Sequence, residues 1–194
     1  IISNPPKKID RRSVAEVFHQ VVKLDPHTAS ITALKSAAEK RGWAPTSTLN
    51  DDSQQAREFW LDLILGIGVA EMLSDAGACF IYDYPACMAM LTQTRPGTPP
   101  IAERFELCWR GVELANGGNE LIDAKLVAQR FTDDQEQRRV DGLDVQVGDA
   151  RLVAAHLHGV PACAGVALGV DRLLALALGF DSIAPVLPFS WEVA

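Results

Sequence analysis

The chain has 194 residues, of which 48% are apolar and 22% are charged, and its formal net charge is −7. This length suits one large domain or two very small ones, and the composition excludes disordered, collagen-like and disulfide-scaffold chains. No run of about 18 apolar residues occurs, so a membrane-spanning helix is not expected. Residues 51–194 carry ten Lys or Arg against twenty-one Asp or Glu, which argues against a general nucleic-acid binder.

The cysteines and histidines predict no metal centre. The four cysteines never approach CxxC spacing, and together with the four histidines they form no zinc pattern. No secretory signal is visible at the start of the sequence. Reduced thiols and the absence of such a signal predict a cytoplasmic protein with no membrane association.

Three amphipathic helices are predicted in the first part of the chain. Ser13 and Glu16 form a capping box, and the apolar residues after them recur at helical spacing over about 13–24. A second helix covers about 31–41 and stops at Gly42, and a third starts near Asp51 or Ser53. We expect these helices to form one compact unit over residues 1–76.

The periodicity changes after Gly77, and strands alternate with helices from there on. A strand over 79–85 is followed by a loop over 94–100 and by a hairpin that Gly117 and Gly118 break. The remaining elements are listed in chain order: hairpin strands over 104–109 and 112–116, helices over about 123–141 and 149–158, a buried strand over 161–168, and a helix over 171–178. The predicted fold class is α+β.

The hairpin places two carboxylates on one face of the sheet. If Arg110 and Gly111 form the turn, side chains 106, 108, 113 and 115 share a face. Glu106 then lies diagonal to Glu113 at roughly 7 Å. A hard divalent cation such as Mg²⁺, bound by carboxylates and substrate phosphates, would relieve their repulsion. The alternative is a solvated face with two unrelated acids.

Two further segments suit a charged ligand. Asn116 and Glu120 flank paired glycines and offer an amide and a carboxylate to an ammonium group, although an Asn-Gly turn is a common alternative. Gly169 leads a buried strand into a helix, and Arg172 lies in its first turn, where the helix dipole disfavours a cation. A guanidinium there suits a phosphate, unless it simply pairs with a nearby acid.

Together these residues resemble the lysyl-tRNA synthetase branch of the class II aminoacyl-tRNA synthetases. The run from Gly165 to Arg172 is similar to the third motif of that family, and the segments over 104–106 and 112–121 are similar to its ATP and lysine strands. The resemblance implies an antiparallel synthetase sheet flanked by helices. Residues 1–76 would be a helical insertion, and residues 77–194 would be the C-terminal part of the catalytic domain.

The resemblance also implies a role for each site residue. Arg172 would be the catalytic residue that binds the γ-phosphate of ATP, with Gly169 beside it. Glu106 and Glu113 would hold ATP and Mg²⁺. The amino acid would be bound by four residues: Asn116, Glu120, Gly165 and Ala167.

Within this branch the chain most resembles the truncated paralogues that attach β-lysine to elongation factor P. Asp83 to Ala86 resembles their Pro-Ala strand end, and Ala167 stands where the tRNA enzymes usually carry glycine. An added methyl on the pocket wall fits a shifted β-amino substrate. Gly118 replaces a usual aromatic residue, and Cys87 and Met88 replace a polar pair, so both departures bear on substrate identity.

The expected activity is ATP-dependent activation of lysine or β-lysine and its transfer to elongation factor P. The family's second motif, Phe-Arg-x-Glu, is not found, since no Phe-Arg dipeptide occurs in the sequence. We therefore expect this chain, by itself, to be an incomplete catalytic domain that adenylates poorly. The first-motif interface of a homodimer is also missing. A fragment of a lysine–tRNA ligase, with tRNA as acceptor, and a non-catalytic lysine- or nucleotide-binding module remain as alternatives.

Overall fold

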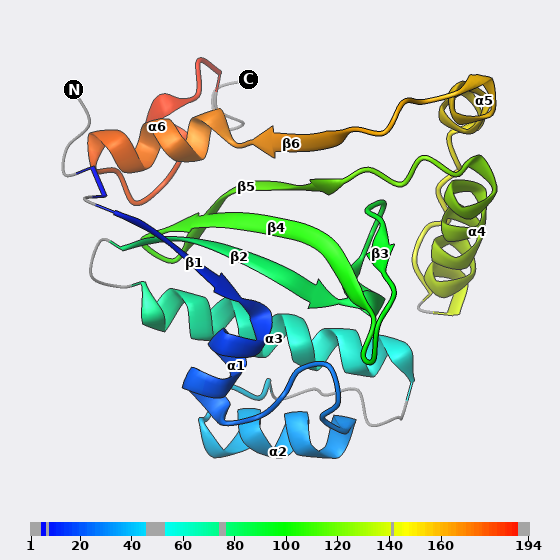
Figure 1. Cartoon of the computed structure of the whole chain (residues 1–194). Coiled ribbons are helices and arrows are strands. Elements are labelled where there is room, and N and C mark those ends of the chain that lie inside the picture. The colour runs from blue at the N-terminus through cyan, green and yellow to red at the C-terminus, as the bar shows by residue number, and fades with distance from the viewer. Residues whose placement is uncertain (1–4, 7, 46–52, 74–76, 141, 190–194) are drawn as a thin grey trace.

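The computed structural model describes residues 5–6, 8–45, 53–73, 77–140 and 142–189, and it confirms the α+β class. Six strands form one sheet in the order β1-β2-β4-β5-β6, with β3 on a branch beside β4 (Figure 1). The β1–β2 pairing is parallel and all other pairings are antiparallel. The sheet is therefore mixed, whereas an antiparallel sheet was predicted.

The N-terminal helices form where caps and apolar spacing predicted them. They are α1 (Val14–Val22), α2 (Ile31–Lys40) and α3 (Gln54–Met72). The Ser13 hydroxyl accepts from the Glu16 amide at 3.2 Å, and the Glu16 carboxylate accepts from the Ser13 amide at 2.7 Å, so the capping box is confirmed. Ser53 caps α3, and Asp51 lies outside the described residues. The division of the chain at residue 76 stays a prediction, because that residue is also outside them.

The remaining elements keep the predicted order of strands and helices, with β3, η1 and η2 in addition. They are β2 (Ala78–Pro85), η1 (Ala86–Met88), β3 (Thr94–Arg95), β4 (Ile101–Trp109), β5 (Val112–Asn119), α4 (Ala124–Val140), α5 (Ala150–His158), β6 (Ala164–Leu168), α6 (Val170–Leu178) and η2 (Ala184–Val186). None of the described helices combines the length and the apolar character that crossing a bilayer requires.

Two strands were not predicted, and both strands of the hairpin were predicted too short. The strand β1 (Ile9–Ser13) is polar and forms through its pairing with β2, and β3 pairs with β4 inside the predicted loop. Gly117 and Gly118 do not break the hairpin but continue β5. A Cβ on Gly117 would lie 2.3 Å from the carbonyl oxygen of Gly165, so glycine is needed there for β5 and β6 to pair.

The two faces of the sheet are covered by different helices. The larger core cluster joins α1, α2 and α3 to one face, through residues such as Phe18, Trp60 and Ile81. A smaller cluster joins Leu173 and Leu176 of α6 to the opposite face. Figure 1 shows α4 and α5 beyond the ends of β5 and β6.

The prediction that the strand before α6 is buried is wrong. In β6, Val166 is 62% exposed and Leu168 is 48% exposed. Within the described residues β6 pairs with β5 alone, so it forms an edge of the sheet. Its apolar sequence resembled that of a strand covered on both sides, which is why the sequence pattern misled the prediction.

Candidate functional site

The predicted carboxylate pair lies on the hairpin of β4 and β5, in a register that contains a β-bulge. Trp109 pairs with Val112 and Cys108 pairs with Glu113, as predicted. The register then shifts, so that Leu107 pairs with Ala115 and Glu106 pairs with Asn116. Ala115 consequently faces away from Glu113, which corrects the predicted set of side chains on that face. Asn116 takes its place beside the two acids.

The side chain of Asn116 joins the two carboxylates. Its Nδ2 atom donates to Oε1 of Glu106 at 3.2 Å and to Oε1 of Glu113 at 3.3 Å. The two acids therefore converge on one donor, at a place where a cation would find oxygen ligands from both. Mg²⁺ in phosphate-transfer sites is commonly bound by one or two carboxylates plus substrate phosphates, so this pair fits it. In the described ranges no group of three or more His, Cys, Asp or Glu side chains could hold a metal by itself.

Arg104 is part of this site and was not found from the sequence. Its Nη2 atom donates to Oε1 of Glu106 at 2.5 Å, and its Nε atom donates to Oδ1 of Asn116 at 3.3 Å. The guanidinium also lies over the ring of Tyr84, 4.6 Å from its centroid. Arg104 precedes Glu106 by two residues on the same strand, so the period-two alternation places both on one face. That spacing was the signal that could have identified it.

The pKa of the Glu106 carboxyl depends on its burial and on the neighbouring Arg104. Burial raises the pKa of the Glu106 carboxyl, and the adjacent Arg104 cation partly offsets the rise. The side chains of Arg104 and Glu106 are only 10% and 17% exposed. Breaking such a pair leaves a buried charge without a partner, so we treat it as a fixed part of the site.

Arg172 lies in the first turn of α6, as predicted, and reaches the same group of residues. Its Nη1 atom donates to the carbonyl oxygen of Glu113 at 3.0 Å and lies 3.8 Å from Oε2 of Glu113. The Arg172 side chain is 54% exposed, so this ion pair contributes little and is easily exchanged. Arg172 is therefore free to bind an incoming anion, whereas Arg104 is not.

The four predicted amino-acid-binding residues line one cavity of about 440 Å³. They are Asn116, Glu120, Gly165 and Ala167, and Arg104 lines it as well. Gly169 is outside this lining, and its amide donates to the carbonyl oxygen of Leu114 at 2.8 Å as α6 begins. Asn116 thus belongs both to the carboxylate group and to the cavity, which makes the two parts contiguous.

Glu120 is held at its backbone from two sides. Its amide donates to the carbonyl oxygen of Cys163 at 3.0 Å, and its carbonyl oxygen accepts from Nε2 of Gln93 at 3.1 Å. A Cβ on Gly165 would lie 2.1 Å from Oε1 of Glu120. Glycine at position 165 therefore leaves the space that the Glu120 carboxylate occupies in the cavity.

Gly118, which stands where the family usually has an aromatic residue, is closely surrounded in the structure. A Cβ there would lie 2.4 Å from Cγ2 of Thr92 and 2.5 Å from the carbonyl oxygen of Glu103. Thr92 is itself buried, and its hydroxyl donates to the carbonyl oxygen of Ala89 at 2.7 Å. No side chain fits at position 118 in this backbone, because Thr92 already fills that side of the cavity.

Comparison with known proteins gives two findings. Residues 8–192 match the family model described as tRNA synthetases class II (D, K and N). Proteins named "Elongation factor P--(R)-beta-lysine ligase" from Salmonella paratyphi B and Salmonella heidelberg are each 39% identical to the chain over 182 residues. These matches cover 94% of this chain but 55% of either relative, so the chain spans about half the length of the curated relatives it matches.

Proposed function

Because the chain belongs to the family of class II tRNA synthetases (D, K and N), we propose that it provides the amino-acid-binding part of an ATP-dependent ligase. The substrate would be lysine or β-lysine, activated as the aminoacyl-adenylate. The acceptor would be a lysine side chain of elongation factor P, which the names of the relatives indicate. The observation that carries the proposal is the shared cavity, in which Glu120 and Asn116 lie next to the paired carboxylates.

Each residue has a definite part in the proposed reaction. A carboxylate oxygen of the amino acid attacks the α-phosphorus of ATP, and the bond from this phosphorus to the pyrophosphate oxygen breaks. Glu120 and Asn116 hold the amino groups of the substrate, so that its carboxylate is directed outward to the phosphates. Arg172 binds the departing pyrophosphate, since its guanidinium is only loosely held by Glu113. The acceptor amine then attacks the acyl carbon, AMP leaves and the amine loses a proton.

Glu106 and Glu113 would hold Mg²⁺, which supplies charge neutralisation at the phosphates. No side chain acts as a nucleophile, and the chain contributes mainly by positioning and by electrostatic stabilisation. The arginine of a Phe-Arg-x-Glu motif would clamp the α-phosphate, and the sequence holds no Phe-Arg dipeptide. We therefore propose that this chain binds the substrates but turns them over slowly.

The choice between lysine and β-lysine rests on Ala167. It pairs with Asn116 across β5 and β6, so its methyl group lies at the wall of the cavity beside the predicted amine ligand. We propose that this methyl displaces the α-amino position and favours a β-amino group. Replacing Ala167 by Gly should shift the ratio of the two dissociation constants toward lysine, and an unchanged ratio would refute the assignment.

Calorimetry tests the proposed function directly. We expect lysine or β-lysine to bind the chain, and Glu120→Gln to weaken that binding by at least tenfold, since a charge-assisted hydrogen bond contributes about 1.5–3 kcal/mol. Glu136→Gln, on the exposed surface of α4, is the matched control and should leave binding unchanged. Absence of binding by the native chain, or equal affinities for the two variants, would overturn the proposal.

A further inference from the structure

The amino-acid cavity offers polar groups for the ends of a substrate but few apolar side chains for its middle. Its lining from β5 and β6 includes Gly117, Gly118 and Gly165, which contribute backbone alone. Another part of the lining comes from residues 90–92, which follow η1. Met90 has the longest apolar side chain among the residues that line the cavity. It is therefore the lining residue best suited to contact a chain of methylene groups.

The backbone of Met90 is held in an unfavourable conformation. Its φ angle is 51°, in the left-handed region that residues with a side chain seldom adopt. Such a conformation persists only where the surrounding structure imposes it, and it is concentrated at sites that bind ligands. The constraint on Met90 is therefore a reason to look for a ligand contact at this residue.

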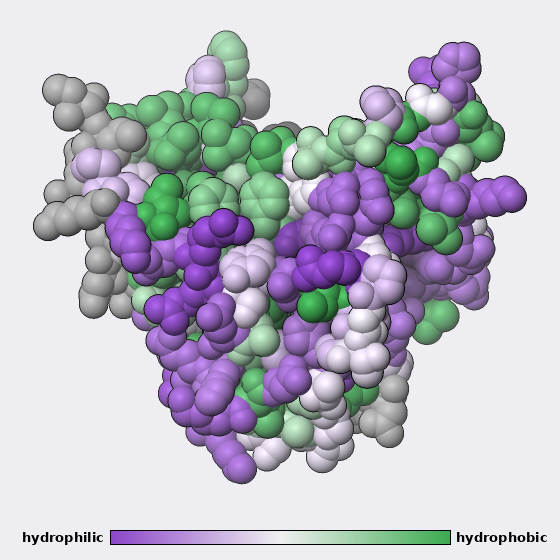
Figure 2. Space-filling view, viewed as in Figure 1, coloured by the Kyte–Doolittle hydropathy of each residue, from purple (hydrophilic) through white to green (hydrophobic). Residues whose placement is uncertain are grey.

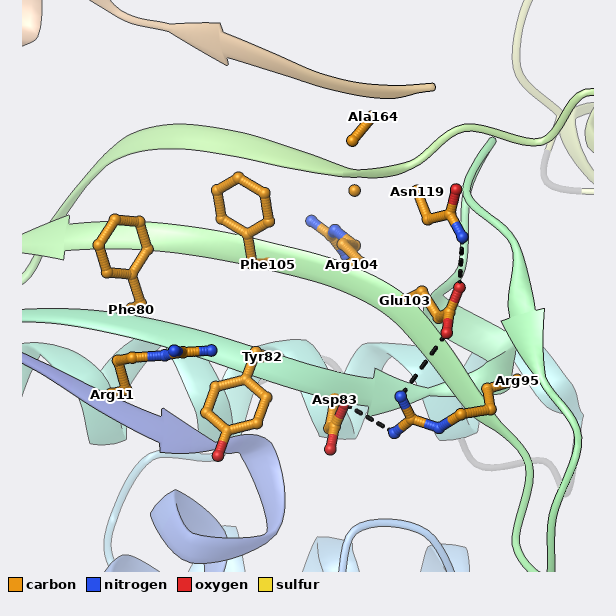
Figure 3. Close-up of a pocket in the computed structure, with 11 residues that line it drawn as sticks. Arg11, Phe80, Tyr82, Asp83, Arg95, Glu103, Arg104, Phe105, Asn119 and Ala164 are labelled. Carbon is orange, nitrogen blue, oxygen red and sulfur yellow. Dashed lines mark hydrogen bonds and ion pairs between the residues drawn. The ribbon is translucent and has the colours of Figure 1, made fainter. Parts of the chain in front are cut away.

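The segment after Met90 is bound to the end of β5. The amide of Leu121 donates to the carbonyl oxygen of Leu91 at 2.9 Å. Just before this point, Nδ2 of Asn119 donates to Oε2 of Glu103 at 2.6 Å, which ties the end of β5 to β4 (Figure 3). The support on this side of Met90 is therefore part of the sheet.

Two guanidinium groups hold carbonyl groups of the same segment. Nη1 of Arg104 donates to the carbonyl oxygen of Met88 at 3.3 Å. Nη1 of Arg130, on α4, donates to the carbonyl oxygen of Met90 itself. The helix is anchored near this arginine by Val127, which is 1% exposed. Arg130 therefore fixes the orientation of the peptide group that follows Met90.

The side chain of Met90 is not part of the packed interior. The residue is 65% exposed and belongs to neither core cluster. Exposure alone is not distinctive, because Figure 2 shows hydrophobic residues gathered over α6 and β6 as well. What distinguishes Met90 is that a constrained backbone holds its exposed apolar side chain at the cavity.

We propose that Met90 is a specificity-determining residue, whose thioether side chain covers the methylene chain of the bound amino acid, and that Arg130 is its positioning residue. The ligand class is an amino acid with an unbranched chain that carries an ammonium group, since the Glu120 carboxylate lies in the same cavity. An unbranched, polarisable thioether adapts well to such a chain. This assignment rests on the proposed function, because it requires that the amino acid binds in this cavity.

Methyl NMR of the native chain tests the contact directly. The chain contains three methionines, so labelling their methyl carbons gives three signals, and Met90→Leu identifies the one from Met90. We expect saturating lysine to shift this signal and to give nuclear Overhauser contacts between the Met90 methyl group and the lysine methylenes. Met72, which lines a separate groove at the end of α3, is the internal control, and its signal should not move.

Met90→Gly separates the binding role from the stability of the fold. Glycine relieves the left-handed backbone and removes the cover, so the melting temperature should not fall, whereas calorimetry should show lysine binding at least fivefold weaker. Lys23→Gly is the matched control, because Lys23 has a φ angle of 60° at the end of α1 and does not line the cavity. It should bind lysine like the native chain.

Arg130 is tested by two variants that differ in hydrogen bonding. Arg130→Met cannot donate to the carbonyl oxygen of Met90 and should weaken lysine binding, whereas Arg130→Lys keeps a donor and should restore most of the affinity. Equal losses in the two variants would refute the positioning role.

The results distinguish this assignment from the proposed function. If lysine binds but leaves the Met90 signal unmoved, or if Met90→Gly binds with native affinity, the assignment is overturned and the proposed function is retained. The same holds if Lys23→Gly weakens binding as much as Met90→Gly. If the native chain binds neither lysine nor β-lysine, the proposed function is refuted and the assignment with it.

Discussion

The substitution Gly165→Ala separates the role of the cavity from the stability of the fold. The new Cβ would lie 2.1 Å from Oε1 of Glu120, whereas ordinary contact begins at 3.4 Å. The carboxylate must therefore move by about 1 Å or more, a displacement that can cost about 100-fold in a positioned reaction. Because the clashing atom is the far end of a flexible side chain, the fold should be almost unaffected.

Two other glycines provide the comparison. A Cβ on Gly117 meets the backbone of β6, at 2.3 Å from the carbonyl oxygen of Gly165, and no side-chain motion relieves that contact. Gly66, within α3, has open space around the corresponding position, so alanine there should stabilise the helix by roughly 0.5–1 kcal/mol. We expect Gly117→Ala to lower the melting temperature, Gly66→Ala to raise it slightly and Gly165→Ala to leave it unchanged.

Calorimetric titration with lysine and β-lysine then measures the effect on the cavity. Gly165→Ala should weaken binding roughly 10- to 150-fold, the loss expected from one misplaced charge-assisted hydrogen bond of about 1.5–3 kcal/mol. Gly66→Ala should bind like the native chain. The reasoning is refuted if Gly165→Ala binds with native affinity, or if it unfolds at as low a temperature as Gly117→Ala.

Three more predictions concern the supporting residues. Arg104→Gln should lower the free energy of unfolding in urea by about 3–5 kcal/mol, because it leaves the buried Glu106 carboxylate without its cationic partner. Arg139→Gln, which breaks an exposed ion pair, should change that free energy by less than about 1 kcal/mol. Similar losses for the two variants would contradict this prediction. The pKa of Glu106 is raised in the folded state, so the folded chain keeps this proton to a higher pH than the unfolded chain does. The free energy of unfolding should therefore fall as the pH rises from the ordinary carboxyl pKa through the raised one. Glu106→Gln should remove this part of the pH dependence, and an unchanged slope of the unfolding free energy against pH would argue against it. Ser13→Ala should cost about 1 kcal/mol by deleting the cap of α1, and thermal unfolding that matches the native chain would show that the cap is dispensable.

The helices and the order of the elements could be predicted because their signals are local. Ser13 caps a helix whose apolar spacing is visible in the sequence, and the structure begins α1 directly after it. The strands were harder, because their pairing partners are distant. The polar segment of β1 becomes a strand only beside β2, and Gly117 resembles a turn residue until its approach to Gly165 is known. Burial of β6 was predicted from its composition, which does not say whether a covering segment is present.

In the candidate site, too, the local pattern could be predicted from the sequence, whereas the exact strand pairing could not. Alternation along the hairpin correctly brought Glu106 and Glu113 onto one face, since it requires only the turn at Arg110 and Gly111. It could not predict the bulge, which moves Asn116 between the two carboxylates. The roles assigned to these residues stay predictions, because they came from the resemblance to a family and the geometry agrees with them without testing them.

The charges of the site suggest how nucleotide and cation binding depend on each other. Glu106 is paired with the buried Arg104, and Glu113 is paired with the exposed Arg172. With each carboxylate near its own guanidinium, the group is close to neutral and attracts a free divalent cation only weakly. A nucleotide changes this balance, because its phosphates withdraw Arg172 from Glu113 and supply further oxygen ligands. We therefore expect Mg²⁺ to bind appreciably only together with ATP, and we expect Arg172→Gln to weaken nucleotide binding while strengthening the binding of the cation alone.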